Sequence, residues 1–136
     1  PGKAIVGNAG FLVTSVIDSF ISDGKLILVL DTSVNHNPEV FEYQKSPELL
    51  EADQQGEYTC LLVGSSCLAG DVFGEYRFKK QPKVGDRLVF THVGAYSLIK
   101  ANRFNGYNLP DVYSVDHNSA ISLLTQSTYQ DYRKQW

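Results

Sequence analysis

The residues of this chain that could do chemistry gather in one short stretch, GSSCLAGDVFGEYRF, at residues 64–78. Cys67 stands there among small residues, with Gly70 and Asp71 close behind it and apolar runs on both sides. Glycine lets a backbone turn sharply or approach a ligand closely, and loops at strand ends often carry function. A cysteine in such a loop could serve as a nucleophile if a base lies nearby. The alternative is that Cys67 fills space as a small apolar residue and that the glycines only form turns.

Two chemical arrangements for Cys67 find little support in the spacing. A Cys-His pair needs a histidine within hydrogen-bond reach, and no spacing links Cys67 to His36, His92 or His117. His92 instead alternates with its neighbours in a strand-like run, as structural histidines often do. A zinc site needs about four ligands at short spacing, whereas Cys60 and Cys67 stand alone, without a Cys-x-x-Cys or His-x-x-x-His motif. We therefore expect no metal, and two reduced thiols in a cytoplasmic protein.

A second candidate for chemistry is Tyr96, which follows Gly94 and Ala95 at the end of a strand-like run. The small neighbours leave space around the ring, and a tyrosine hydroxyl can donate to an anion such as a phosphate. A tyrosine that only packs in the core or at a corner is the alternative. The stretch Phe104-Asn105-Gly106 that follows predicts a turn with Asn or Gly at positive φ.

Composition and charge exclude several classes of partner. The chain has 136 residues, 43% of them hydrophobic, which suits one domain with its own core. The formal net charge is -3 and no long run of Lys or Arg occurs, so we expect neither nucleic acid nor a membrane as partner. No apolar run approaches the roughly 20 residues of a membrane span. The chain lacks methionine, also at position 1, and opens like the middle of a protein, so we expect a piece of a longer polypeptide.

The elements that must position these residues are mainly strands. A hairpin is predicted through Asp23-Gly24, and a long polar excursion with a short helical turn near residues 47–52 follows it. The end predicts a short helix capped by Ser127, with Gln130 three positions on. The predicted strands cover residues 9–20, 25–31, 58–64, 75–80, 87–93, 109–115 and 120–125. Seven short strands with turns between them predict a mostly β barrel or sandwich over residues 1–136.

Four segments of the chain together resemble one known family. The segments PGKAIVGNAGFLVTSVID, LVLDTSVNHNPEVFEY, SSCLAGDVFGEYRF and KVGDRLVFTHVGAYSLIKANRFNG occur in this order. They resemble the C-terminal β-domain of the fold type III pyridoxal-phosphate decarboxylases, which include the ornithine, diaminopimelate and carboxynorspermidine decarboxylases. LDTS, a nearby histidine, PE and CLAGD most resemble the carboxynorspermidine decarboxylases. Diaminopimelate decarboxylases carry an acidic residue after the cysteine, where this chain has Leu68; decarboxylases of siderophore pathways stay open.

The resemblance implies roles for particular residues. In the family, a (β/α)8 barrel holds the Schiff-base lysine and most contacts to pyridoxal phosphate, and each β-domain completes the active site of the other subunit of a homodimer. Cys67 would then help to protonate the substrate carbon that has lost carbon dioxide. Tyr96 would lie near the cofactor phosphate, and Lys3 stands where the family has a phosphate-contacting arginine. The candidate substrate contacts are Asp31, His36, Leu68 and Asp71.

The expected function is that of the C-terminal domain of a decarboxylase, which acts on a small basic amino acid or a carboxylated polyamine. The lysine that binds the cofactor would lie upstream of Pro1, so this part of the enzyme is expected to be inactive by itself. A binding or dimerisation domain without a catalytic role is one alternative. An amino-acid racemase is another, because racemases share the fold, although CLAGD together with FNG fits decarboxylases better.

Overall fold

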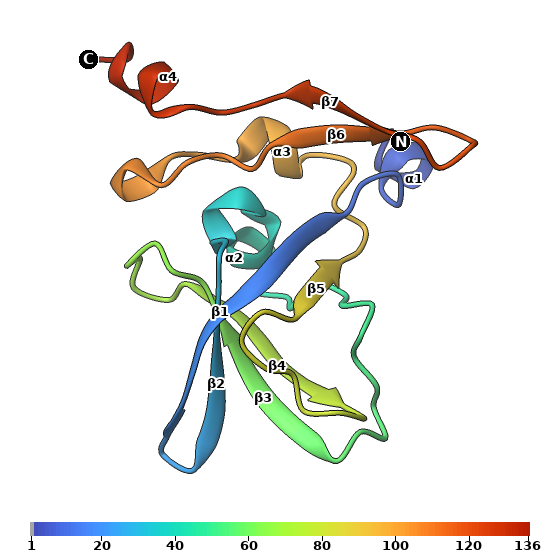
Figure 1. Ribbon diagram of the computed structural model, residues 1–136, viewed down its shortest axis with the longest axis vertical. Coiled ribbons are helices and arrows are strands. Elements are labelled where there is room, and N and C mark those ends of the chain that lie inside the picture. Colours follow the sequence, from blue (N-terminus) through green and yellow to red (C-terminus); the bar gives the residue numbers. More distant parts are fainter. Residues whose placement is uncertain (1) are drawn as a thin grey trace.

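The computed structural model describes residues 2–136 and consists mainly of strands (Figure 1). A five-stranded sheet has the order β4-β3-β2-β1-β5, and β6 and β7 form a separate two-stranded sheet. The expected mostly β fold is confirmed. The strands within the described residues are β1 (Leu12–Ser22), β2 (Lys25–Leu30), β3 (Tyr58–Val63), β4 (Val72–Phe78), β5 (Arg87–Phe90), β6 (Val112–Val115) and β7 (Ile121–Thr125).

The predicted hairpin between β1 and β2 is confirmed. Ser22 pairs with Lys25, and the two residues between them, Asp23 and Gly24, have φ of 50° and 75°. A two-residue turn with both residues at positive φ matches the right-handed twist of the paired strands, and Asp-Gly is a preferred sequence for it. The long β1 strand therefore folds back on β2, and the register shifts once, between Val16 and Asp18.

The sheet also contains one parallel pair, β2 with β3, which the sequence did not predict. A parallel pair needs a crossover, and this one includes the 3-10 turn η1 (Val34–His36) and the short helix α2 (Glu39–Tyr43). Because parallel strands run in the same direction, β2 and β3 leave the sheet at the same end. The segments that follow them, residues 31–36 and 64–71, are brought together there.

The sheet curls so that its two edge strands approach each other. Phe73 of β4 and Phe90 of β5 are buried and stack with their ring centroids 4.7 Å apart. The core lies inside this curl and consists of Leu12, Val16, Leu28, Leu30, Val34, Val40, Leu49, Cys60, Leu62, Phe73, Tyr76, Phe78, Leu88 and Phe90. The sheet thus forms half of a barrel around one apolar core.

The segment at residues 48–53 bridges the two edge strands. In place of the short helical turn predicted over residues 47–52 there is a single turn without a helix, in which the Ala52 amide donates to Leu49 over 3.2 Å. The amide of Leu50 donates to Val89 of β5 over 2.9 Å, and the amide of Asp53 donates to Arg77 of β4 over 2.8 Å. An open sheet edge presents unpaired backbone groups. The backbone of this segment therefore pairs with both edges in place of forming a helix.

The short helix predicted at the C-terminus is present as α4 (Tyr129–Arg133), but its predicted cap is wrong by one residue. The cap is Thr128, whose side chain accepts from the Asp131 amide while the Asp131 carboxylate accepts from the Thr128 amide. The predicted pair, Ser127 and Gln130, is also three residues apart, so the spacing alone does not distinguish the two pairs. A carboxylate is a stronger acceptor than an amide oxygen, which favours the pair with Asp131.

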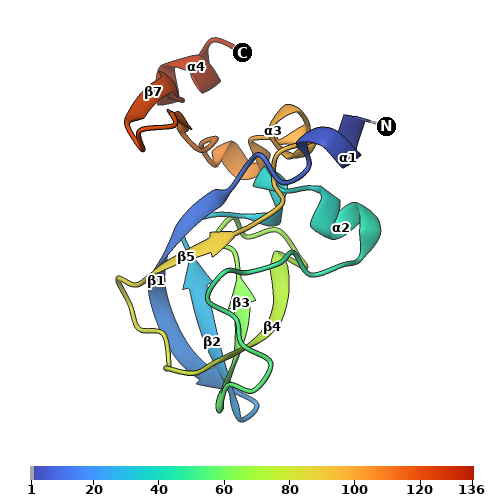
Figure 2. The same ribbon diagram turned by 90° about the vertical axis from the view of Figure 1, so that its right-hand side faces the viewer.

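The chain after Ser97 forms what we call the C-terminal arm, residues 98–136. It holds β6, β7, α4 and the 3-10 turn η2 (Phe104–Gly106), and it begins within the helix α3 (Ser97–Lys100). The arm lies at the end of the molecule opposite the turn between β1 and β2 (Figures 1 and 2). Within the described chain, no residue of the arm is buried. Residues 2–136 also include no helix that is long and apolar enough to cross a membrane.

Candidate functional site

The end of the sheet where β2 and β3 leave together carries a cluster of buried polar residues. Thr32, Ser33 and His36 follow β2, and Ser66 follows β3. All four residues are at most 4% exposed. Buried polar groups are stable only when they are hydrogen-bonded, so this cluster must be tightly organised. The exposed Cys67 directly follows it in the chain.

Asp71 is the centre of this cluster. One carboxylate oxygen accepts from the Val34 amide over 2.8 Å, and the other accepts from the Ser66 amide over 3.1 Å and the Ser66 hydroxyl over 2.5 Å. The residue is only 6% exposed. Its charge is therefore stabilised by donors from two loops, and it ties the segment after β2 to the segment after β3.

The glycines around Cys67 have local reasons that the sequence did not show. A Cβ added at Gly64 would collide with the carboxylate of Asp71, and one added at Gly74 would collide with Ser46. Gly70 has a φ of 84° in the turn in which the Asp71 amide donates to Leu68. The backbone is bare because it must pass close to the side chains of Asp71 and Ser46 and turn sharply at Gly70.

Cys67 itself lies at the exposed tip of this loop, with a φ of 59°. Leu68 behind it is half-buried and packs against the apolar core. The other cysteine, Cys60, is buried in β3, and burial raises the pKa of its thiol. The two cysteines thus differ in exposure, and both thiols are unpaired within the described residues.

Two residues of the C-terminal arm contact the Cys67 loop. The Asn105 amide nitrogen donates to the Ser66 carbonyl over 2.8 Å, and the Tyr107 hydroxyl lies 2.7 Å from the Ser65 hydroxyl. Asn105 has a φ of 56°, which confirms the turn with Asn at positive φ predicted there. The sequence showed that turn but gave no sign that its side chain reaches the cysteine loop.

His36 is a buried residue of this cluster. Its Nδ1 lies 2.9 Å from the Thr32 hydroxyl, and its ring centroid lies 5.3 Å from that of Tyr107. Burial lowers the pKa of His36, and the carboxylate of Asp71 opposes that effect only in part. Its Nε2 is buried and has no hydrogen-bond partner among residues 2–136. We therefore expect His36 to be neutral near pH 7.

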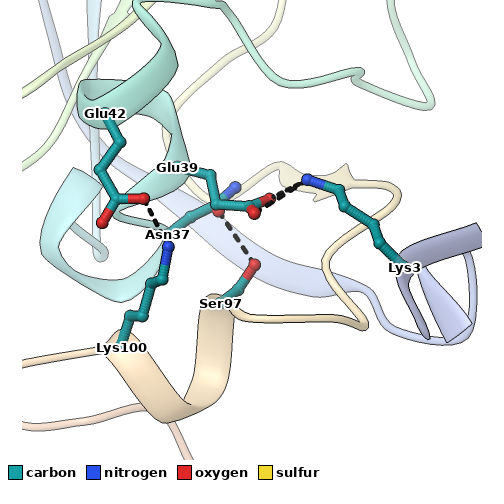
Figure 3. A network of polar contacts seen from close by, with 6 residues as sticks. All are labelled: Lys3, Asn37, Glu39, Glu42, Ser97 and Lys100. Carbon is teal, nitrogen blue, oxygen red and sulfur yellow. Dashed lines mark hydrogen bonds and ion pairs between the residues drawn. The ribbon is translucent and has the colours of Figure 1, made fainter. Parts of the chain in front are cut away.

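Tyr96 is the N-terminal cap of α3 and is 48% exposed, and the Lys100 ammonium lies 5.3 Å from the centre of its ring. The next residue, Ser97, is buried and donates from its hydroxyl to Asn37 Oδ1 over 3.0 Å (Figure 3). Asn37 is the C-terminal cap of η1. The position of Tyr96 is thus set by a buried contact to the turn η1.

Cys67 and Tyr96, the two principal candidates, each lie next to a serine that is hydrogen-bonded to a cap of the turn η1. Cys67 follows Ser66, whose hydroxyl accepts from Ser33, the N-terminal cap of η1, over 2.9 Å. Tyr96 precedes a serine that is bonded to the opposite cap. Two residues that are far apart in the sequence are held on one scaffold, each beside a buried serine.

Lys3 lies in the described helix α1 (Gly2–Val6) and is already paired. Its ammonium is 2.7 and 2.8 Å from the two carboxylate oxygens of Glu39 and 5.1 Å from the centre of the Tyr43 ring. Lys100 pairs in the same way with Glu42 over 2.6 Å. Figure 3 shows that these two ion pairs join α1 and α3 to α2.

Asp31 belongs to a different part of the surface. The residue is exposed, and its carboxylate accepts from the Thr14 hydroxyl over 2.5 Å and the Ser15 amide over 2.7 Å, both in β1. The structure therefore brings His36, Leu68 and Asp71 together beneath Cys67, while Asp31 is bonded toward the neighbouring strand. Among residues 2–136, no group of three or more His, Cys, Asp or Glu could hold a metal.

Comparison with known proteins defines the class of this domain. Residues 5–94 match the family model described as pyridoxal-dependent decarboxylase, C-terminal sheet domain. The chain belongs to this family. It is 36% identical to a carboxynorspermidine/carboxyspermidine decarboxylase of Campylobacter jejuni, over 97% of this chain and 38% of that protein. It is also 36% identical to a carboxyaminopropylagmatine decarboxylase of Synechocystis, over 98% of this chain and 35% of that protein.

Solved structures agree with this assignment. The crystal structure of carboxynorspermidine decarboxylase from Campylobacter jejuni, complexed with norspermidine, superposes with a TM-score of 0.92 and 35% identity. The match covers 99% of this chain and 40% of that chain. A diaminopimelate decarboxylase structure superposes with a TM-score of 0.86 at 22% identity, which shows the shared fold alone. The chain thus spans about two fifths of the length of the relatives that it matches.

Proposed function

We propose that this chain is the C-terminal domain of a pyridoxal-phosphate-dependent decarboxylase whose substrate is a basic amino acid or, more narrowly, a carboxylated polyamine. The substrate class is supported by the two relatives at 36% identity, both named for carboxylated polyamines. A diaminopimelate decarboxylase of Methanocaldococcus jannaschii is 25% identical. The half-buried Leu68, in place of an acidic residue, also argues against a diaminopimelate substrate.

The observation that carries the proposal is the common anchoring of Cys67 and Tyr96 on the turn η1. Cys67 is exposed at the tip of a loop whose base is buried and hydrogen-bonded, so the thiol can reach a substrate without disturbing the core. In this role, the Cys67 thiol donates a proton to the substrate carbon after carbon dioxide has left. General acids of this kind are held in place by rigid surroundings.

The residues present fit only the outer part of a cofactor site. The hydroxyl of Tyr96, a residue that is 48% exposed, would donate to the phosphate of the cofactor. The ammonium of Lys3 would have to exchange Glu39 for that phosphate. When bound, pyridoxal phosphate supplies the electron sink for the loss of the carboxylate. Most cofactor contacts would then come from a barrel domain outside this chain.

The proposed enzyme is a homodimer in which Cys67 of one subunit enters the active site of the other. An exposed thiol on a short loop fits that arrangement, and two unpaired cysteines fit a reducing compartment such as the cytoplasm. His36 and Asp71 would shape the floor beneath the thiol, and Leu68 and Asp31 would border the substrate. The alternative is a dimerisation domain without a catalytic role, in which the thiol has no function.

Replacement of the thiol in the full-length enzyme tests the proposal. We expect Cys67→Ala to lower kcat by about 100- to 10,000-fold, the usual contribution of a general acid, with a smaller change in KM. The matched control is Cys60→Ala, which removes the buried thiol and should reduce stability while kcat stays near wild type. An unchanged kcat in Cys67→Ala would favour the dimerisation domain.

A mixing experiment extends this test to the proposed dimer. The Cys67→Ala chain is combined with a chain that lacks the Schiff-base lysine. If subunits exchange freely, half of the dimers are hybrids with one intact site, and about a quarter of wild-type activity should return. If exchange is confirmed and no activity returns, the thiol does not act across the interface.

A further inference from the structure

The peptide bond directly before Cys67 is held by a side chain from another part of the fold. The amide nitrogen of Asn105, in η2, donates to the carbonyl of Ser66 over 2.8 Å. That carbonyl belongs to the peptide that joins Ser66 to Cys67. Its orientation and the backbone angle φ of Cys67 are therefore coupled, because both depend on how this one peptide plane is turned.

The other polar atoms of Ser66 are bonded to groups at the end of the sheet. Its amide and hydroxyl donate to Asp71, and its hydroxyl accepts from Ser33. These contacts fix where Ser66 lies. They do not fix its carbonyl, whose hydrogen bond comes from Asn105 in the C-terminal arm.

The conformation of Cys67 needs such a support. Its φ of 59° lies in the left-handed region, which few residues other than glycine adopt. Such a conformation costs energy and persists when the surroundings hold it. The bond from Asn105 holds the peptide in the orientation that this φ requires, so it fixes the direction in which the thiol leaves the loop.

The chemistry of the contact requires an amide at position 105. A carbonyl oxygen only accepts, so Asn105 must present its nitrogen to Ser66. The residue also has a φ of 56°, which asparagine and aspartate tolerate better than most side chains. Aspartate at this position would keep the backbone but would place a carboxylate oxygen against the carbonyl.

We propose that Asn105 is a positioning residue that orients Cys67 toward the reacting carbon. The inference rests on the proposed function, in which the Cys67 thiol protonates that carbon. Tyr107, from the same segment as Asn105, makes a second contact with the Cys67 loop, because its hydroxyl lies 2.7 Å from that of Ser65. Proton donors need placement within about 0.5 Å of the productive geometry, so the loss of this support falls on the chemical step.

The test is Asn105→Asp in the full-length enzyme. We expect kcat to fall by about 10- to 100-fold, as for a displacement of about 1 Å, and KM to change far less. The matched control is Asn102→Asp, the same substitution three positions away. Asn102 uses its side-chain oxygen to accept from the Phe104 amide over 3.1 Å, and aspartate keeps that acceptor. The kcat of Asn102→Asp should equal that of the wild type.

A double-mutant cycle separates positioning from a general loss of structure. If Asn105 acts through the thiol, Asn105→Asp causes no further loss of activity in a Cys67→Ala enzyme. An equal loss in both backgrounds, or wild-type kcat in the single variant, overturns the inference while the role of Cys67 stands.

The labelling rate of Cys67 by a thiol reagent gives a second readout that does not depend on catalysis. The rate should change in Asn105→Asp and not in Asn102→Asp, because only the first substitution frees the peptide before the thiol. If Cys67→Ala keeps full kcat, the proposed function fails, and this labelling comparison still decides whether Asn105 holds the loop. Equal rates in all three proteins would overturn the positioning role.

Discussion

The five-stranded sheet and the C-terminal arm use the same backbone pairing, yet only the sheet has a core. Leu28, Leu30 and Leu62 of the sheet are 0% exposed. In the arm, Tyr113 faces Leu123 across the β6–β7 pair, but these side chains are 53% and 50% exposed. The comparison shows that strand pairing needs a second layer before apolar residues are buried, and the curl of the sheet supplies that layer.

The candidate site lies where these two regions meet. The sheet contributes Asp71 and Ser66, which are buried, and the arm contributes Asn105, which is exposed. The Cys67 loop therefore rests on a buried base and is contacted from the other side by an exposed segment. Sites that need both precision and access are commonly built at such boundaries.

Hydrogen exchange should give the largest contrast between the regions. Amides of β3 exchange only when most of the core opens, whereas amides of β7 exchange when a two-stranded pair frays. We expect protection in β3 to exceed that in β7 by about 1000-fold or more, given a usual domain stability of about 5–15 kcal/mol. The measurement is exchange of the folded domain followed by NMR. Equal protection would show that the arm unfolds together with the sheet.

A matched pair of leucine substitutions compares the two regions by stability. Leu62→Ala opens a cavity in the core and should lower the free energy of unfolding by about 2–5 kcal/mol. Leu123→Ala removes a half-exposed side chain of the arm and should cost about 0.5 kcal/mol. Urea denaturation of both variants checks this difference. A large loss for Leu123→Ala would mean that another layer covers β7 in solution.

The smallest effect is expected from His36, which lies where the sheet meets the C-terminal arm, and it concerns the pH dependence of stability. Burial lowers its pKa in the folded state below the value of about 6.5 in the unfolded state. Unfolding then takes up a proton between these two pKa values, so stability is complete above about pH 6.5 and falls as the pH drops toward the folded-state pKa. His36→Gln should remove this part of the pH dependence. The control is His117→Gln, in the exposed turn between β6 and β7, which should keep it.

Denaturation midpoints measured from pH 7.5 to pH 5 decide this prediction. Other groups also titrate in this range, so the comparison is between the two variants and the wild type. A slope that persists unchanged in His36→Gln would show that His36 is not the source of this acid sensitivity.

The sequence by itself determined the local features of this protein. Alternation of apolar residues placed the strands, Asp23-Gly24 set the first hairpin, and small residues around Cys67 marked an exposed loop after a buried strand. The motif pattern also indicated the family, which the match over residues 5–94 shows. These features depend on backbone preferences and on side-chain periodicity within a few residues, so they can be recognised without knowledge of the fold.

Only the tertiary structure decided which distant groups meet. The parallel pairing of β2 with β3 brings Ser33 to Ser66, and the curl of the sheet draws residues 48–53 across its edges against their predicted helical turn. The sequence also gave no sign of why residue 64 is glycine. The carboxylate of Asp71 packs against the Gly64 backbone and leaves no space for a side chain. Buried donors and acceptors must find partners wherever the fold provides them, and that choice depends on strand order and not on neighbouring residues.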